Sequence, residues 1–202
     1  MFSVSLILFA LVSTATPGPN NIMILTSSLN FGIKRSIPHW LGIITGAPFM
    51  MSVIGLGLTQ FFIWWPASFL GMKLIGAAYL LYLAMKIALA PTVINDKKQQ
   101  PMNYWQGFLF QWINPKAWVM SIGAIATFSS NEHSLLQVLS ISGTFLWVGF
   151  FAVGSWLVIG FHLQKLLLHP FHRHVFNIVM ALILAGSILP MLIESINNLL
   201  SF

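Results

Sequence analysis

The chain has 202 residues, of which 57% are hydrophobic and only 6% are charged, and its formal net charge is +6. Soluble domains carry about 25% charged residues, so this composition, with a mean hydropathy of +0.86, leaves too little polar surface to cover a water-soluble globule. The chain must therefore use the lipid bilayer as its solvent, and the absence of cysteine excludes disulfides and thiolate metal sites.

Six apolar segments are long enough to cross a membrane as helices. A helix needs about 20 apolar residues to span the hydrocarbon core. Such runs cover residues 4–29, 39–63, 67–90, 105–128, 136–161 and 175–195. The connections between them are short and leave no room for a soluble domain. We therefore predict an all-α integral membrane protein in which residues 1–202 form a single membrane domain.

The first predicted span is interrupted in its middle by the sequence TATPGPNNIM, residues 14–23. Its two prolines lack backbone donors, so the carbonyl groups of Ser13 and Ala15 lose their helical hydrogen-bond partners. The glycine adds backbone freedom, and the two asparagines bring amides that require hydrogen bonds. The break supplies five candidate site residues: Pro17, Gly18, Pro19, Asn20 and Asn21.

The same N-terminal segment also invites a signal-peptide interpretation, because small residues follow an apolar run. However, no Lys or Arg precedes Lys34, so the positively charged start of a signal peptide is missing. Hydrophobicity also resumes beyond the break. We therefore expect a first transmembrane helix that is retained.

The basic residues are distributed unevenly among the predicted loops. Loops one, three and five carry them, whereas loops two and four contain none. In chain order these residues are Lys34, Arg35, Lys86, Lys97, Lys98, Lys165 and Arg173. Cytoplasmic loops are enriched in Lys and Arg, so we predict that these three loops are cytoplasmic and that both termini are periplasmic. Membrane topology, rather than binding of nucleic acid, accounts for the positive net charge.

The fourth predicted span reads QGFLFQWINPKAWVMSIG and contains a second interruption about ten residues in. Pro115 lies between Asn114 and Lys116, and it frees the carbonyl of Gln111 as the prolines of span one free theirs. These four residues are further candidates for a site.

Paired helix breaks in two inverted halves are typical of secondary transporters, whose binding site lies at the midplane between the halves. The halves cover about residues 1–95 and 103–202, and each contains three spans. An odd number of spans forces the two halves into opposite orientations. A lone proline often only kinks a membrane helix, but here each break carries additional polar groups. We therefore expect six transmembrane helices in two inverted three-helix repeats, with both breaks contributing to one site.

Lys116 lies about 11 residues into span four, roughly 16 Å along the helix and near the middle of the bilayer. An ionisable side chain there is costly, and it is usually functional or paired. No Asp or Glu lies near the middle of a span, so a substrate carboxylate is a candidate partner. The freed carbonyls of Ser13, Ala15 and Gln111 are then candidates to accept a substrate ammonium group. The alternative is that Lys116 only bonds freed carbonyls.

Lys73 lies about seven residues into span three and admits two interpretations. It can reach the membrane surface by snorkelling. It can also point inward from a face of small residues, Gly76, Ala77 and Ala84, which permits close packing of helices. We keep Lys73 as the tenth candidate for the binding site.

Glycines recur at helix-packing spacings in two of the spans. Gly42 and Gly46 form a GxxxG pair in span two, and span five contains Gly143, Gly149, Gly154 and Gly160. Such residues allow helices to approach closely, and hinges for alternating access are the alternative interpretation.

Three stretches, PGPNNIMILTSSLNFG, GMKLIGAAYLLYLAMKIA and FQWINPKAWV, resemble the LysE/RhtB family of amino-acid exporters, and the resemblance covers almost the whole chain. It implies proton-driven efflux of amino acids or close derivatives across the bacterial inner membrane. Many members carry an acidic residue after the second glycine of span two, where this chain has Ala47. In lacking that acid the chain is similar to the cysteine/O-acetylserine branch, and it also resembles the homoserine/threonine branch.

We therefore predict a secondary active exporter of small neutral amino acids. A lysine or arginine substrate is disfavoured, because no carboxylate in the membrane core would compensate its side chain. The predicted partners are the amino acid, protons as the coupling ion, and the lipid bilayer. The sequence is also compatible with a homo-oligomer.

Two other classes of function are weighed against this prediction. An ion channel or metal-ion exporter is the first alternative, and an intramembrane enzyme is the second. Both would require Asp, Glu or His near the middle of the spans, and we find none there. We expect no cofactor, no metal site at the HPFHRH sequence, and no ATP hydrolysis, because the GxxxxGK[ST] motif is missing.

Overall fold

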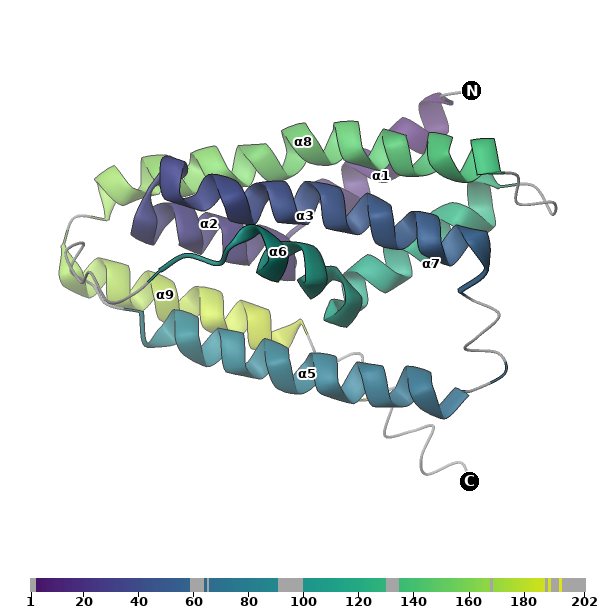
Figure 1. Cartoon of the computed structure of the whole chain (residues 1–202). Coiled ribbons are helices and arrows are strands. Elements are labelled where there is room, and N and C mark those ends of the chain that lie inside the picture. Colours follow the sequence, from purple (N-terminus) through teal and green to yellow (C-terminus); the bar gives the residue numbers. More distant parts are fainter. Residues whose placement is uncertain are drawn as a thin grey trace.

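The structure is a computed structural model that describes residues 3–58, 64, 66–90, 100–129, 135–167, 169–187, 189 and 193. Helices make up the described part of the chain (Figure 1). They are α1 (Val4–Ala15), α2 (Pro19–Phe31), α3 (Ile33–Val53), the π-helical η1 (Ile54–Leu58), α5 (Pro66–Ala88), α6 (Tyr104–Phe110), the 3₁₀-helical η2 (Gln111–Ile113), α7 (Pro115–Phe128), α8 (Leu135–Leu166) and α9 (Pro170–Gly186). The predicted all-α class is confirmed for these residues.

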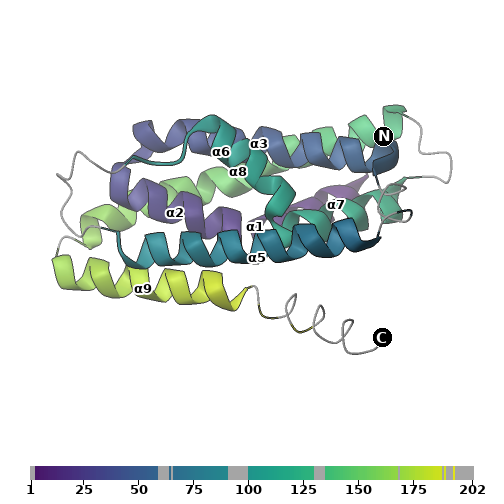
Figure 2. The ribbon, with the colours of Figure 1, turned by 60° about the horizontal axis from the view of Figure 1, so that its bottom comes forward.

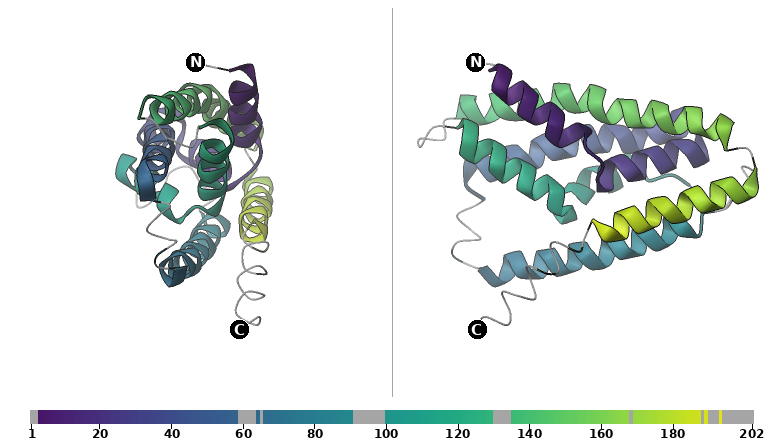
Figure 3. Two further views of the ribbon diagram at one scale, coloured as in Figure 1. Left: turned by 90° about the vertical axis from the view of Figure 1, so that its right-hand side faces the viewer. Right: turned by 180° about the vertical axis from the view of Figure 1, so that it is seen from behind.

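Two of the predicted spans consist of helices joined in series. Span one becomes α1 and α2, which residues 16–18 separate, and span four becomes α6, η2 and α7. The right-hand view of Figure 3 shows α1 and α2 meeting at a bend in the interior of the molecule, and Figure 1 shows the bend between α6 and α7. Both predicted helix breaks are therefore present.

Helix α3 begins earlier than the sequence predicts. The predicted spans leave residues 30–38, which end at Pro38, as a loop. In the structure the chain turns at Gly32 alone, which has a φ of 79° and separates α2 from α3. Glycine adopts this left-handed conformation without a steric penalty. Pro38 then lies inside α3, where it removes the bond to the carbonyl of Lys34. Lys34 is exposed in the first turn of the helix, so this carbonyl lies at the surface.

The helix lengths and the outer surface fit a bilayer. The stretches Ile33–Gly57 and Leu135–Gln164 are each long and apolar enough to cross it, and Val4–Ala15 and Leu74–Ala88 are shorter apolar helices. Large apolar side chains are exposed on several helices, among them Leu8, Val12, Ile75, Val119, Phe151 and Leu182. Such an apolar surface is stable against acyl chains and unfavourable in water.

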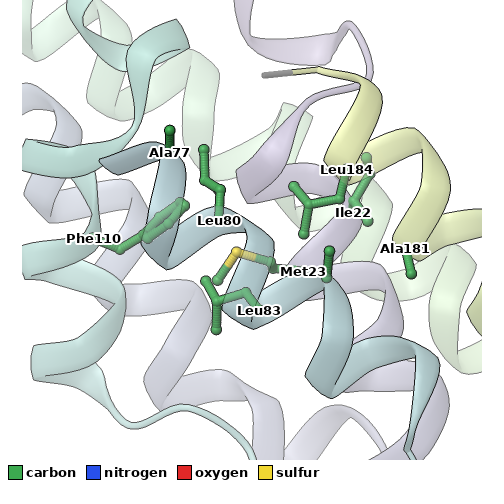
Figure 4. Close-up of a cluster of buried hydrophobic side chains, with 9 residues drawn as sticks. Ile22, Met23, Ala77, Leu80, Leu83, Phe110, Ala181 and Leu184 are labelled. Atoms are coloured by element: carbon green, nitrogen blue, oxygen red, sulfur yellow. The ribbon is translucent and has the colours of Figure 1, made fainter. Parts of the chain in front are cut away.

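The helices form a bundle with a distinct pair along one side. Helix α8 packs against α1, α2 and α3, and α3 also packs against α6. Helices α5 and α9 lie side by side (Figures 2 and 3). An apolar cluster joins this pair to α2 and α6 (Figure 4). Its buried members are Ile22, Met23, Ala77, Leu80, Leu83, Ala84, Phe110, Ala181 and Leu184.

The two ends of the molecule differ in charge. The turn from α2 to α3, the end of α5 and the connection from α8 to α9 lie at one end, and the starts of α1 and α8 lie at the other (Figure 1). Lys34, Arg35, Lys86 and Arg173 all belong to the first of these ends, which we call the basic end. This grouping is what the distribution of basic residues among the loops predicts.

Some of the predicted glycine contacts are present and others are not. The GxxxG pair of α3 packs directly on α6, and a Cβ on Gly46 would lie 2.6 Å from a backbone carbonyl oxygen of that helix. Gly160 of α8 packs on the backbone of Leu25 in α2. Among the described residues, however, a Cβ on Gly143 or Gly149 would meet nothing within 4 Å. The packing interpretation is therefore wrong for these two glycines.

Candidate functional site

The two helix breaks meet through a pair of side-chain amides. Asn20 Nδ2 donates to Gln111 Oε1 at 2.8 Å, and Gln111 Nε2 donates to Asn20 Oδ1 at 3.1 Å. The second donor hydrogen of Gln111 reaches the carbonyl of Gly107 at 2.9 Å. Gln111 is fully buried, and a buried amide of this kind is stable because its polar atoms are bonded. The two residues lie 91 positions apart in the chain, so this pair fixes one break against the other.

The first break is an extended segment between two capped helices. Thr16 ends α1, with its N–H bonded to the carbonyl of Val12 at 3.3 Å. Gly18 is extended, and Pro19 occupies the first position of α2, where its missing donor costs nothing. The side chain of Lys116 lies over Gly18, because a Cβ there would be 2.7 Å from Lys116 Cδ. Glycine at this position therefore leaves room for the lysine.

Lys116 binds the C-terminal end of α1. Its Nζ donates to the Thr16 carbonyl at 2.7 Å, to Thr16 Oγ1 at 2.8 Å and, less closely, to the Pro17 carbonyl at 3.4 Å. A cation at this end of a helix is also favoured by the helix dipole. The described part of the chain contains no carboxylate that could pair with it, since Asp96, Glu132 and Glu194 all lie outside that part. In this conformation, Lys116 therefore bonds oxygen atoms of the break.

The three carbonyls that the prolines free are already bonded. The Ser13 carbonyl accepts from Thr16 Oγ1 at 3.1 Å, and the Ala15 carbonyl accepts from the indole of Trp156 at 3.1 Å. The Gln111 carbonyl accepts from the backbone of Asn114 at 3.2 Å. Each of these carbonyls therefore already accepts one hydrogen bond in this conformation, and its binding to a substrate ammonium stays a prediction. Donors on neighbouring residues and helices satisfy them, as is usual at breaks in membrane helices.

Other acceptors remain open at the first break. Asn21 Nδ2 donates to the carbonyls of Thr14 and Thr16 at 2.7 and 2.9 Å. The other amide atom, Asn21 Oδ1, is buried and has no hydrogen-bond partner among the described residues. The same holds for Thr14 Oγ1. These two oxygen atoms are therefore further candidates, beside the freed carbonyls, to bind a ligand ammonium group. The threonines of the TATPG sequence were a signal for this chemistry that the prediction left unused.

The second break is organised by Asn114. Its side-chain oxygen accepts from the backbone N–H of Lys116 at 3.1 Å, and Pro115 occupies the first position of α7. Asn114 has the extended conformation that a following proline favours. Asn114 is buried. These residues start α7 and thereby aim Lys116 at the first break.

A small cavity lies where the two breaks meet. Its volume is about 20 Å³, measured as the space open to the centre of a water molecule, which suffices for one water. The lining includes Ser13, Thr14, Gly18, Asn20, Asn21, Asn114, Lys116, Ala117, Met120 and Val153. Five of the ten predicted site residues thus line one cavity: Gly18, Asn20, Asn21, Asn114 and Lys116. At this volume the cavity has no room for a solute larger than water in this conformation.

The other candidates fall into two groups. Pro17, Pro19, Gln111 and Pro115 shape the breaks or fix them together, without lining the cavity. Lys73 lies in α5, but its side chain lies outside the described part of the structure, so its role stays a prediction.

Almost the whole length of the chain matches a known family of membrane transport proteins. Residues 11–194 fit the protein-family model described as LysE type translocator. The chain belongs to this family. LysE type translocators move solutes and are not enzymes, so the intramembrane-enzyme hypothesis is set aside. Family membership agrees with the resemblance carried by PGPNN and NPKAW.

Similarity to individual LysE family proteins extends over most of both chains. The chain is 30% identical to the cysteine/O-acetylserine efflux protein of Escherichia coli strain K12 over 177 aligned residues. The aligned residues cover 87% of this chain and 90% of that protein. The same values hold for the proteins of this name from Shigella flexneri serotype 5b (strain 8401) and Shigella sonnei (strain Ss046). No solved structure matches the chain.

Proposed function

We propose that this LysE family protein is a proton-driven secondary exporter of small neutral amino acids or their derivatives across the bacterial inner membrane. One observation carries the proposal: a lysine ammonium and two unpartnered oxygen atoms line one cavity at the junction of two broken helices. Such a cavity is complementary to the backbone of an amino acid. The substrate carboxylate would bind Lys116, and its ammonium would bind Asn21 Oδ1 and Thr14 Oγ1.

The order and breakage of the helices support an inverted-repeat architecture. The proposed repeats, about residues 1–95 and 103–202, would each provide three spans, the first of them broken. Discontinuous helices that place their half-helix ends at a central site are the usual design of secondary transporters. The grouping of basic residues at one end supports a cytoplasmic position for that end and periplasmic termini.

The charge of the cavity supports a neutral side chain in the substrate. Among the described residues that line it, Lys116 is charged and none is acidic. A lysine or arginine side chain would therefore add an uncompensated cation, which costs several kcal/mol in a membrane interior. The names of the relatives support cysteine and O-acetylserine as substrates, with threonine and homoserine as further candidates.

Transport requires the cavity to open. A volume of about 20 Å³ holds one water and cannot hold an amino acid. In the proposed cycle, a substrate carboxylate replaces the Thr16 and Pro17 oxygens as the partner of Lys116, and the loss of those bonds releases α7 from the end of α1. The opening of one side and the closing of the other would then expose the site alternately.

Efflux from proteoliposomes tests this function. Vesicles of purified protein are loaded with radiolabelled O-acetylserine, threonine or lysine, and a proton gradient is imposed. Saturable, gradient-dependent efflux of the two neutral compounds, with lysine retained, is the expected result. Vesicles that hold the same amount of Lys116→Met protein serve as the control. Efficient lysine efflux would contradict the substrate class, and ion flux without amino-acid efflux would instead indicate a channel.

A further inference from the structure

A second and larger cavity lies at the basic end of the molecule. Its volume is about 100 Å³ by the same measure, of the same order as the ~150 Å³ cavity that holds benzene in another protein. Helices α2, α3 and α5 and residues 100–102 form its walls. Its polar lining residues are Thr26, Ser27, Asn30, His39, Lys86 and Gln100. This cavity is distinct from the one at the helix breaks, because the two share no lining residue.

His39 in this cavity is a buried imidazole without hydrogen bonds. It is 1% exposed, and neither ring nitrogen has a partner among the described residues. The ring is held in place by α6, because a Cβ on Gly107 would lie 3.0 Å from His39 Cδ2. Buried polar groups are normally bonded, and one without a partner requires an explanation. His39 is not among the candidates predicted from the sequence, because it is the first residue of predicted span two. In the structure it lies in the second turn of α3.

The other polar groups make the second cavity complementary to a zwitterion. The Lys86 ammonium and the His39 N–H can donate to a carboxylate. Asn30 Nδ2 bonds the Thr26 carbonyl at 2.9 Å, which leaves its Oδ1 as the other polar atom of the amide. That oxygen is buried and has no partner among the described residues, and it can accept from an ammonium group. None of the described residues that line it is acidic. The cavity thus offers one cationic donor, one imidazole N–H donor and one open acceptor.

Helix α2 connects the two cavities. Asn20 lies at one end of it and Asn30 at the other, about 15 Å apart along the helix. Ser27 lies seven residues after Asn20 and therefore on the same face. Two members of the apolar cluster of Figure 4, Met23 and Leu83, line the second cavity, and none of its described members lines the cavity at the breaks. A ligand in the second cavity would therefore contact this apolar cluster.

We infer that the second cavity is an access site, in which Lys86 and His39 bind the carboxylate of the amino acid, and Asn30 binds its ammonium group, before the apolar cluster opens toward Lys116. This inference rests on the proposed function. It adds a site that selects zwitterions at the basic end, where the solute first meets the protein.

Transport kinetics from the basic side test the access site. Lys86→Met removes the ammonium and keeps the length of the side chain, and His39→Phe keeps a ring and removes both nitrogens. Each is expected to raise the KM for O-acetylserine at the basic side about tenfold and to leave the maximal rate within about twofold, because the site at the breaks is intact. Lys34→Met is the matched control, since Lys34 is an exposed lysine at the same end that does not line the cavity. Its KM is expected to equal that of the wild type.

The outcomes separate the access site from the proposed function. If the wild-type protein exports no amino acid, the proposed function fails, and the access site fails with it. If the wild type exports O-acetylserine but Lys86→Met and His39→Phe keep its KM, the access site alone is wrong. A fall in maximal rate with an unchanged KM would show a structural role and would also overturn it. If inorganic phosphate competes with O-acetylserine as well as a second neutral amino acid does, the second cavity is a general anion site and not a zwitterion site. Should His39→Phe fail to give a monodisperse protein, Lys86→Met decides the question.

Discussion

Lys116 makes two different sets of bonds in the proposed cycle, one with the end of α1 and one with the substrate. Lys116→Met keeps the length of the side chain and removes the charge. The proposed pair of Lys116 with the substrate carboxylate would lose one partner, which costs about 2–5 kcal/mol in a buried charged pair, so efflux is expected to fall by about 30-fold or more at matched expression. Lys116→Arg is expected to restore only part of the activity, because a planar guanidinium does not replace a compact ammonium.

A matched variant distinguishes the charge of Lys116 from its role at the end of α1. Thr16→Val removes one of the oxygens that Lys116 binds, Thr16 Oγ1, and leaves both carbonyl acceptors in place. It is expected to retain efflux within a few-fold of the wild type. Wild-type efflux by Lys116→Met would mean that this lysine only caps the helix, and the proposed site would lose its main residue.

Single residues also mark the limit of prediction from this sequence. The sequence alone shows that a lysine lies near the middle of a span, where its charge is costly. It also shows which carbonyl groups lose their helical partner at each proline. The donor that satisfies the Ala15 carbonyl could not be predicted, because Trp156 lies 141 positions from Ala15 and nothing in the local sequence joins them. The same holds for the pairing of Asn20 with Gln111. The open acceptors at Thr14 and Asn21 emerge only when the packing of α1, α2 and α8 is known.

At the scale of helices, close crossings depend on particular glycines. Gly160→Ala places a methyl group against the carbonyl of Leu25, and it is expected to lower the midpoint of thermal unfolding by several degrees because backbone atoms cannot easily move aside. Gly143→Ala on the same helix is the control. It meets nothing within 4 Å in the described structure, and alanine favours a helix over glycine by about 1 kcal/mol. Unfolding of detergent-solubilised protein measures both, and an equal midpoint for the two variants would contradict the packing account.

The helices themselves were largely predictable from the sequence, and their boundaries were less so. Apolar runs set the elements, and proline-containing polar runs set the breaks in spans one and four. The predicted start of the second span, residue 39, is wrong because Pro38 lies inside α3 and does not end a loop. A proline in the first turns of a helix removes a bond whose acceptor lies at the surface, and the single residue Gly32 makes the turn that the sequence appeared to assign to a nine-residue loop.

At the scale of the whole molecule, the charge difference between the two ends predicts its orientation. The chain has no cysteine, so single cysteines can be introduced without background. Lys34→Cys places a thiol at the basic end and Leu135→Cys places one at the opposite end, and both positions are exposed. In intact spheroplasts, a membrane-impermeant thiol reagent is expected to label position 135 and not position 34. Everted vesicles are expected to give the reverse, and the opposite pattern in both preparations would invert the topology.

The bonds between Lys116 and the end of α1 also bear on the half of the cycle in which no solute is bound. In a carrier whose central cation has no internal partner, that cation is uncompensated whenever the binding site is empty. The unloaded carrier then reorients slowly, and exchange of one solute for another is favoured. Here Thr16 and Pro17 supply that partner, and the unloaded protein can reorient at little electrostatic cost. We therefore expect net export into a compartment that contains no amino acid, at a rate that added external amino acid does not accelerate. The measurement compares the export rate without external amino acid with the rate when external amino acid is present. A much faster rate in the second case would show that the return of the unloaded protein is the slow step, and it would contradict this expectation.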